Sequence, residues 1–411
     1  MAAALGVLVS CGSVKPGEEV VAASRDSKVV VAYVTSWSEV MPDPQYMTHI
    51  NYAFGHVNES FNGVKIDNEE RLRQIVDLRK QKPELKVLLS IGGWGSGRFS
   101  EMAANDEYRR AFAADCDRVV KEFALDGIDI DWEYPTSSMA NISSSPDDTE
   151  NFTLLMQDIR AAIGNEKELT LATVASARYI DFKAILPSVD FVNIMAYDMA
   201  SAPKHHSALY PSGHSGDITS DGAVTAHLKA GVPPSKLVMG MPFYGRGGDG
   251  YPSFQDYNKV GNTDTQYTEK WDEVAQVPYL ADKNDTLVFG FENPRSLAIK
   301  CQYILDKDLL GGMYWDYSGD NEQGDLRRTV AENLLGKPHK AKVLVLTERG
   351  GQHGGFTDAG LKWLAAEGAK GNFSITEINN ARNITEAYLS QFSLVIQLDF
   401  PPYTWPKEAE D

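Results

Sequence analysis

The sequence is poor in cysteine and in basic residues, and both shortages exclude classes of protein. Only three cysteines occur in 411 residues, so the chain is not built on a disulfide framework. Lys and Arg number 39 against 57 Asp and Glu, and the resulting net charge of −18 repels phosphate backbones, which makes nucleic acid a poor partner. There is also no Walker loop, no dinucleotide fingerprint and no zinc-ligand spacing, so we expect neither a metal nor a cofactor.

The three cysteines have different surroundings. Cys116 and Cys301 lie in helix-like stretches and are expected to be buried free thiols, with a bridge between them as the alternative. Cys11 follows a short apolar run and resembles the lipidated cysteine of a bacterial lipoprotein signal. No Lys or Arg precedes that run, so an ordinary frayed N-terminus is the alternative. We therefore expect residues 1–27 to be a signal remnant and linker, with possible membrane anchoring through a lipid on Cys11. This implies an exported, cell-surface or periplasmic lipoprotein of a bacterium.

Apolar and aromatic residues are abundant. Hydrophobic residues make up 43% of the chain, enough for a large core. The 7 Trp, 18 Tyr and 16 Phe include residue types whose apolar face and polar tip suit stacking on sugar rings, although most aromatic residues simply fill cores.

Apolar runs alternate with amphipathic stretches from residue 28 onward. Near-continuous runs of Val, Ile, Leu and Met are typical of parallel strands that are buried on both faces. The eight predicted strands are residues 28–37, 49–56, 86–92, 127–133, 169–176, 191–197, 237–244 and 311–317. Eight β/α units predict a (β/α)8 TIM barrel over residues 28–336, with an open doubly wound sheet as the competing fold.

A second α/β pattern follows the segment 336–340. It contains three predicted strands, at 342–346, 373–378 and 394–397, which is too few for a complete domain of this kind. The stretch 343–353 (VLVLTERGGQH) resembles the start of a ThuA-like (trehalose utilisation) domain, which has an amidotransferase-like fold. We therefore expect residues 341–411 to be a partial domain, cut from a longer protein.

The most informative segment is 126–135 (DGIDIDWEYP). Side chains in a strand alternate between faces, so Asp129, Asp131 and Glu133 share one face, with neighbours roughly 6.6 Å apart. Three carboxylates inside a barrel are costly unless they share protons or shift their pKa values, and such a cost is tolerated mainly at a functional site. A calcium loop is the alternative, but the segment is β-prone rather than rich in turn residues. Asp126 has the opposite parity and is expected to be structural.

This segment resembles the D-x-x-D-x-D-x-E signature of family 18 glycoside hydrolases, the chitinases. Further motifs of that family occur in order at the ends of predicted strands, between residues 29 and 335. They are Ser90-Ile-Gly92-Gly93, Met195-Ala-Tyr197-Asp198, MPFYGR at 241–246 and GMYW at 312–315.

The resemblance implies roles for individual residues. Glu133 corresponds to the proton donor, and Asp131 to the residue that orients the substrate's 2-acetamido group. Asp129 corresponds to an inner partner that shares a proton with Asp131. Tyr197 corresponds to the hydroxyl that holds the acetamido carbonyl. Implied sugar contacts are Tyr33, Trp94, Met195, Asp198, Tyr244, Arg246 and Trp315; implied supports are Ser90, which can bond the acidic cluster, and Gly92 and Gly93, which permit close backbone approach.

The implied activity is substrate-assisted, retaining hydrolysis of β-1,4 bonds in chitin or another N-acetylglucosamine polymer. Only about 25 residues separate Arg246 from Trp271, too few for an inserted domain, so we expect a shallow cleft and endo-type action. Two alternatives remain: an endo-β-N-acetylglucosaminidase acting on N-glycan cores, and a chitin-binding lectin without activity. The lectin is disfavoured because such proteins typically lack the proton donor.

Overall fold

The structure is a computed structural model of the chain. It describes residues 28–248, 251–260, 266–336, 342–347, 354–368, 373–379, 384–389 and 392–398. Cys11 and the rest of the expected signal segment lie outside these ranges. Cys116 and Cys301 are both buried free thiols, as predicted.

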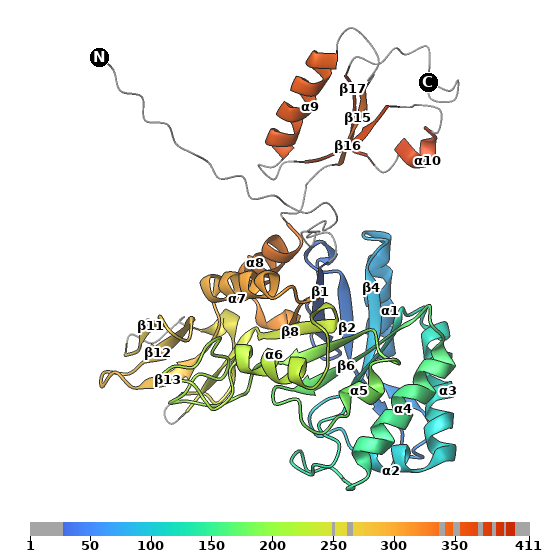
Figure 1. The fold of residues 1–411 in the computed structure, drawn as a ribbon, viewed down its shortest axis with the longest axis vertical. Helices are drawn as coiled ribbons and strands as arrows, with labels where there is room; N and C mark the ends of the chain where they lie inside the picture. The colour runs from blue at the N-terminus through green and yellow to red at the C-terminus, as the bar shows by residue number, and fades with distance from the viewer. Residues whose placement is uncertain are drawn as a thin grey trace, which may run out of the picture.

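Eight parallel strands close a barrel (Figure 1). They are β1 (Val29–Thr35), β2 (His49–Val57), β4 (Lys86–Gly92), β5 (Gly127–Asp131), β6 (Glu168–Val174), β7 (Phe191–Met195), β8 (Leu237–Pro242) and β14 (Gly311–Trp315). The barrel closes because β1 pairs in parallel with both β14 and β2. The predicted TIM barrel is therefore confirmed and the open sheet is excluded. The short strand β3 (Val64–Ile66) adds an antiparallel edge to β2.

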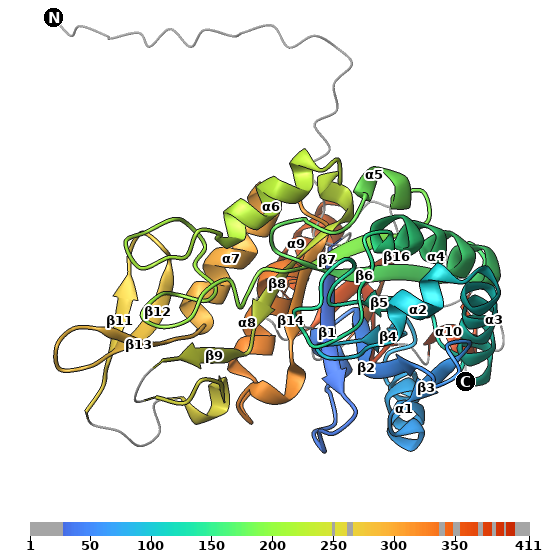
Figure 2. The same cartoon turned by 90° about the horizontal axis from the view of Figure 1, so that it is seen from below.

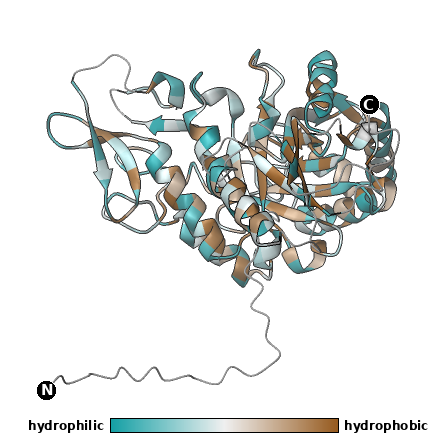
Figure 3. Ribbon diagram, turned by 90° about the horizontal axis from the view of Figure 1, so that it is seen from above, coloured by the Kyte–Doolittle hydropathy of each residue, from teal (hydrophilic) through white to brown (hydrophobic). Residues whose placement is uncertain are grey.

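Helices pack around the strands. They are α1 (Glu69–Val76), α2 (Phe99–Ala104), α3 (Asp106–Glu122), α4 (Asp148–Ile163), α5 (Phe182–Ile185), α6 (Ser220–Lys229), α7 (Pro294–Asp306) and α8 (Asp325–Leu334), with 3-10 turns η2 (Pro44–Tyr46), η3 (Asp77–Lys80), η4 (Pro234–Lys236), η5 (Tyr257–Lys259) and η6 (Tyr317–Gly319). Local sequence sets their starts: the side chain of Asn105 accepts from the first amides of α3, and Asn293 and Ser296 form a capping box at α7. Apolar residues gather along the strands and the inner helix faces (Figure 3).

An antiparallel sheet is inserted between β8 and α7, and it corrects the expectation that no subdomain follows Arg246. Its strands are β9 (Tyr244–Gly247), β10 (Gln255–Asp256), β11 (Thr268–Asp272), β12 (Val277–Ala281) and β13 (Leu287–Gly290). The expectation counted residues only as far as Trp271, whereas two further strands follow it. Leu280, Phe289 and Phe291 give the insertion a small core of its own. Figures 1 and 2 show β11 to β13 projecting on the side of the barrel away from α3.

The C-terminal unit is a three-stranded parallel sheet with two helices. Its elements are β15 (Lys342–Thr347), α9 (Gly354–Gly368), β16 (Ser374–Ile378), α10 (Glu386–Leu389) and β17 (Leu394–Leu398). The central strand is β15, which pairs with both others. The three strands lie where the sequence predicted them. Across all described ranges, no helix combines the length and apolar character that a membrane span needs.

Candidate active site

Strand β5 places carboxylates inside the barrel. Ile128, Ile130 and Trp132 point outward, and Trp132 is buried against Phe99 with ring centroids 5.3 Å apart. Asp129 and Asp131 point to the other face and are also buried. The strand ends at Asp131, two residues earlier than predicted, so Glu133 follows the strand at its carboxyl end. Catalytic residues of TIM barrels occupy this end of the strands.

Asp129 is held by donors from four other strands. Its Oδ2 accepts from the Tyr33 hydroxyl and Ser90 Oγ, both at 2.8 Å. Its Oδ1 accepts from Thr170 Oγ1 at 2.6 Å and Asn193 Nδ2 at 3.3 Å. Burial raises its pKa, and these hydrogen bonds oppose the rise. None of the four donors is Asp131, so the proton sharing expected between the two aspartates stays a prediction.

Asp131 and Glu133 are the two carboxyl groups of this segment that line the cavity. Burial raises the pKa of Asp131 well above its usual range, and the charges of Glu133 and Asp129 add to the rise. Burial also raises the pKa of Glu133 from 4.5 to about 7; a hydrogen bond from Tyr134 opposes this and the charge of Asp198 adds to it. Burial is the largest of these causes. A carboxyl with a pKa near 7 keeps a proton available for donation.

The predicted supports lie beneath this pair. A Cβ on Gly92 would stand 2.0 Å from the Asp131 carbonyl oxygen, and Gly92 has φ +132°. Only glycine fits this approach without displacing the backbone. A Cβ on Gly93 would instead meet the ring of Phe54 at 2.6 Å. Asp126 lies at the opposite end of β5, where it accepts from Arg79 and from the amide of Val87 at 2.7 Å, as a structural residue would.

Aromatic rings line one side of the site. The Trp315 ring lies 5.7 Å from that of Tyr33 and 5.6 Å, stacked, from that of Phe54. Trp37 lies 6.5 Å from Trp315 and is 64% exposed. Tyr33 was predicted to contact sugar directly; it lines the site, but its hydroxyl is already bonded to Asp129. Trp37 and Phe54 were not predicted, because Trp37 was assigned to the end of a strand.

Asp198 and Arg246 form a further polar group that lines the same cavity. Arg246 donates to both carboxylate oxygens of Asp198, at 2.7 and 2.5 Å. Although partial burial alone would raise the pKa of Asp198, hydrogen bonds from Arg246 and His206 lower it well below its usual range. The rings of Tyr197 and Tyr244 meet edge to face at 6.1 Å. Asp198 is therefore a fixed negative charge in the site.

One cavity of about 740 Å³ brings these residues together. Of the predicted residues, it is lined by Tyr33, Trp94, Asp131, Glu133, Met195, Tyr197, Asp198, Tyr244, Arg246 and Trp315. Sequence reasoning missed several further lining residues, among them Trp37, Phe54, Met139, Arg178 and Phe254. The volume is within the range of ligand sites, and the lining combines aromatic surface with a few polar groups. Among the described residues, no cluster of His, Cys, Asp or Glu could hold a metal ion.

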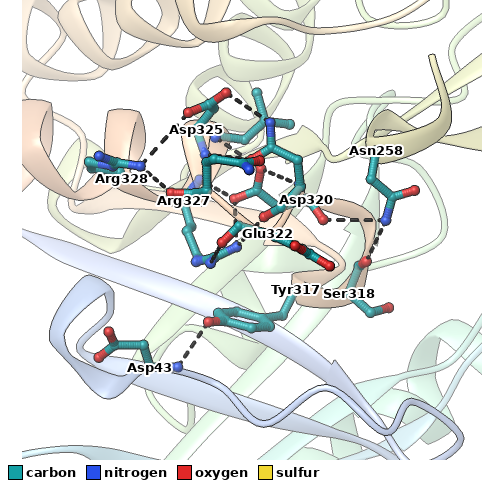
Figure 4. Close-up of polar contacts among 12 residues, drawn as sticks. Asp43, Asn258, Tyr317, Ser318, Asp320, Glu322, Asp325, Arg327 and Arg328 are labelled. Carbon is teal, nitrogen blue, oxygen red and sulfur yellow. Dashed lines mark hydrogen bonds and ion pairs between the residues drawn. The ribbon is translucent and has the colours of Figure 1, made fainter. Parts of the chain in front are cut away.

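A second cavity, of about 1010 Å³, lies between the β1–β2 connection, the insertion and the start of α8 (Figure 4). Its polar groups are engaged with each other: Asp320 accepts from the amide of Arg327 at 2.9 Å and pairs with its guanidinium at 3.1 Å. The backbone amide of Asp43 donates to the Tyr317 hydroxyl at 2.9 Å. We assign the chemistry to the smaller cavity, because it holds Asp131 and Glu133 at the carboxyl end of β5 together with exposed aromatic rings, whereas Asp320 in the larger cavity is already paired with Arg327.

Comparison with known proteins identifies the family of this barrel. The model of the family described as Glycosyl hydrolases family 18 matches residues 29–320. The chain belongs to this family. Its barrel is therefore a glycoside hydrolase domain.

The similar proteins are named as chitinases or related glycosidases. The chain is 29% identical to "Chitinase A1" of Niallia circulans over 78% of its own length and 60% of that protein, so it spans less than two thirds of that relative. It is 31% identical to "Chitotriosidase-1" of Mus musculus, over 72% of this chain and 74% of that one. A solved family 18 N-acetylglucosaminidase from Paenibacillus barengoltzii superposes with a TM-score of 0.69 at 32% identity, covering 74% of this chain and 99% of that one.

Proposed function

We propose that this protein is a chitinase-type hydrolase that cleaves β-1,4 bonds beside N-acetylglucosamine with retention of configuration. One observation carries the proposal: Oδ1 of Asp131 is buried and has no hydrogen-bond partner among the described residues, although the carboxyl lines the cavity beside Glu133. A buried acceptor of this kind is costly unless a ligand supplies a donor. The N–H of a 2-acetamido group is such a donor, and this selects N-acetylated sugars.

The first step needs no nucleophile from the protein, since family 18 enzymes use the substrate's own acetamido oxygen. Glu133 gives its proton to the glycosidic oxygen while the bond from that oxygen to C1 breaks. The acetamido carbonyl oxygen attacks C1 and forms a cyclic oxazolinium cation. Oδ1 of Asp131 accepts the acetamido N–H, and in the ionised form of Asp131 its charge also stabilises the cation. We assign to the Tyr197 hydroxyl, which belongs to a side chain lining the same cavity, the role of holding the carbonyl for attack.

In the second step Glu133, now ionised, takes a proton from water, and the water oxygen bonds to C1 from the face that the leaving group occupied. The oxazolinium ring opens and the acetamido group is restored. Because C1 is attacked twice, the product keeps the configuration of the substrate. A pKa near 7 suits Glu133 for both donating and accepting the same proton.

We further propose that the enzyme binds chain segments and acts in endo fashion. The inserted sheet removes the argument from the short spacing between Arg246 and Trp271. The proposal rests instead on Trp37 and Trp94, whose side chains are 64% and 63% exposed and line the same cavity as Trp315. Exposed rings along a cleft offer stacking surfaces for sugar units beyond the one at the acid.

The decisive experiment measures hydrolysis of a fluorogenic chitotrioside, of chitohexaose and of a high-mannose glycopeptide. Release of the fluorophore and internal cleavage of chitohexaose support the proposal. Activity on the glycopeptide alone would make the protein an endo-β-N-acetylglucosaminidase, and binding without turnover would make it a lectin. Removal of single terminal units from chitohexaose would refute endo action.

Two proposals rest on sequence alone. We propose that Cys11 carries a lipid that anchors an exported protein, and that residues 341–411 belong to a ThuA-like domain. Labelling of growing cells with a radioactive fatty acid tests the first, with Cys11→Ser as the control. An experimental structure of the native protein tests the second, and a sheet around β15 that is unlike an amidotransferase fold would contradict it.

A further inference from the structure

Asp198 has a second neighbour besides Arg246. Nδ1 of His206 lies 3.4 Å from Oδ1 of Asp198 and 3.5 Å from its backbone nitrogen. Asp198 has φ +53°, in the left-handed region that is costly for residues other than glycine. The Asp198 side chain is 40% exposed, so one side of it remains open to the cavity while the other is held. The imidazole thus contacts both the carboxylate and the strained backbone that carries it.

His206 is fully enclosed. Its side chain has no exposed surface, its ring centroid lies 5.4 Å from that of Tyr244, and its backbone oxygen accepts from the amide of Met199 at 3.0 Å. Nε2 is buried and has no partner among the described residues. A polar ring is expensive to bury with one nitrogen unpaired, so the contact that the other nitrogen makes helps to offset the cost. Here that nitrogen faces Asp198.

The residues on either side of His206 anchor the loop after β7 to other parts of the chain. Nε2 of His205 lies 3.2 Å from Oδ2 of Asp272 in the inserted sheet. Ser207 Oγ donates to Glu292 at 2.6 Å, and the buried Lys300 of α7 donates to both Glu292 and the Ser207 carbonyl oxygen. Three consecutive residues therefore fix the loop to the insertion, to the active site and to α7.

We propose that His206 is a positioning residue that holds the carboxylate of Asp198 toward the substrate, with His205 and Ser207 as its anchors. The proposal rests on the proposed function, because the role of Asp198 as a sugar contact belongs to it. His206 does not touch the cavity itself and acts only through Asp198. A ring with a proton on Nδ1 donates to the carboxylate, and a ring without one accepts the Asp198 amide, so both forms fix Asp198.

The charge of Asp198 also reaches the proton donor, since it raises the pKa of Glu133. The titratable or charged groups that interact with Asp198 are His206 on its own loop, Tyr197, Arg246 and Tyr244 on β9, and Glu133 and Tyr134 after β5. Arg246 and His206 are the two that keep Asp198 ionised. Loss of His206 frees the Asp198 carboxylate to move away from Glu133, so the pKa of Glu133 falls and activity that needs its proton is lost at a lower pH on the alkaline side.

The test compares His206→Ala and His206→Asn with wild type, using pH profiles of kcat/KM on a fluorogenic chitotrioside. Asn places a donor and an acceptor near the position of Nδ1, so it is the conservative variant. His227→Asn is the matched control, because His227 is another buried histidine with an unpartnered Nε2, but its Nδ1 faces the Ala223 carbonyl in α6.

We expect His206→Ala to lose roughly tenfold in kcat/KM and its alkaline-limb pKa, near 7 in the wild type, to fall, because a displaced Asp198 carboxylate no longer raises the pKa of Glu133. His206→Asn should recover most of the activity, and His227→Asn should leave the alkaline limb in place. A His206→Ala profile that is lowered at every pH by the same factor, with an unmoved alkaline limb, would show a merely structural role and overturn the proposal.

A second measurement needs no substrate. In a double-mutant cycle on thermal unfolding, His206→Ala and Asp198→Asn should be non-additive by about 2 °C or more if the two side chains interact. Additive effects would overturn the contact. An inactive wild type with coupled substitutions would instead refute the proposed function and leave the contact intact, so the two failures are distinguishable.

Discussion

Replacing Glu133 by Gln should abolish activity and stabilise the fold, and the gain should depend on pH. The Glu133 carboxyl has a pKa of about 7 in the folded protein against 4.5 for an ordinary Glu. Between these values the folded state holds a proton that the unfolded state has released, so stability falls as pH rises through this window. Above pH 7 the ionised Glu133 carboxylate lowers the free energy of unfolding by about 3 kcal/mol, at 1.36 kcal/mol for each pKa unit. This is an upper value, because the side chain partly faces the cavity.

Gln has the same shape and no charge, so the variant avoids this cost. The expected gain in the free energy of unfolding is near zero at pH 4 and up to about 3 kcal/mol at pH 8. Urea unfolding at both pH values measures it, and Glu59→Gln, at an exposed position, is the matched control. The same variant should lose at least about 10²-fold in kcat. A gain of equal size at pH 4 and pH 8 would refute the reasoning, because it would show that ionisation is not the cause.

The remaining predictions concern other parts of the molecule. The kcat/KM profile of the wild type should fall on its alkaline side with an apparent pKa near 7, and a limb near 4.5 would contradict the burial of the acid. Asp131→Asn should lower kcat by roughly 10²–10³-fold with little change in binding, and a rise in KM without a fall in kcat would contradict a role of Asp131 in the transition state. Trp94→Ala should raise KM for long chitin oligomers by about three- to tenfold, whereas Trp363→Ala, 62% exposed on α9, should not; equal effects would show that neither ring marks a subsite. Lys300→Met should cost roughly 3–5 kcal/mol of stability because it leaves a buried carboxylate unpaired, and chemical denaturation that shows under 1 kcal/mol would contradict that pairing.

Much of the barrel and its acidic strand could be predicted because their signals are local. Each buried strand carries its own apolar run, and alternation along β5 separates Ile130 from Asp131 whatever the rest of the chain does. The inserted sheet was missed because its strands are short and irregular in pattern, with hairpins that continue past Trp271. A count of residues between two motif positions could not reveal them.

By itself, the sequence determined which side chains share a face and in which order the strands follow one another. Only the tertiary structure decided their partners. Tyr33 bonds to Asp129 across 96 residues of chain, and Thr170 and Asn193 reach the same carboxylate from two more strands. His206 gave no periodic signal, and its position against Asp198 depends on a loop that Asp272 and Glu292 anchor from elsewhere. The physical reason is that alternation is a property of one strand, whereas burial, hydrogen bonding and the resulting pKa values depend on barrel closure.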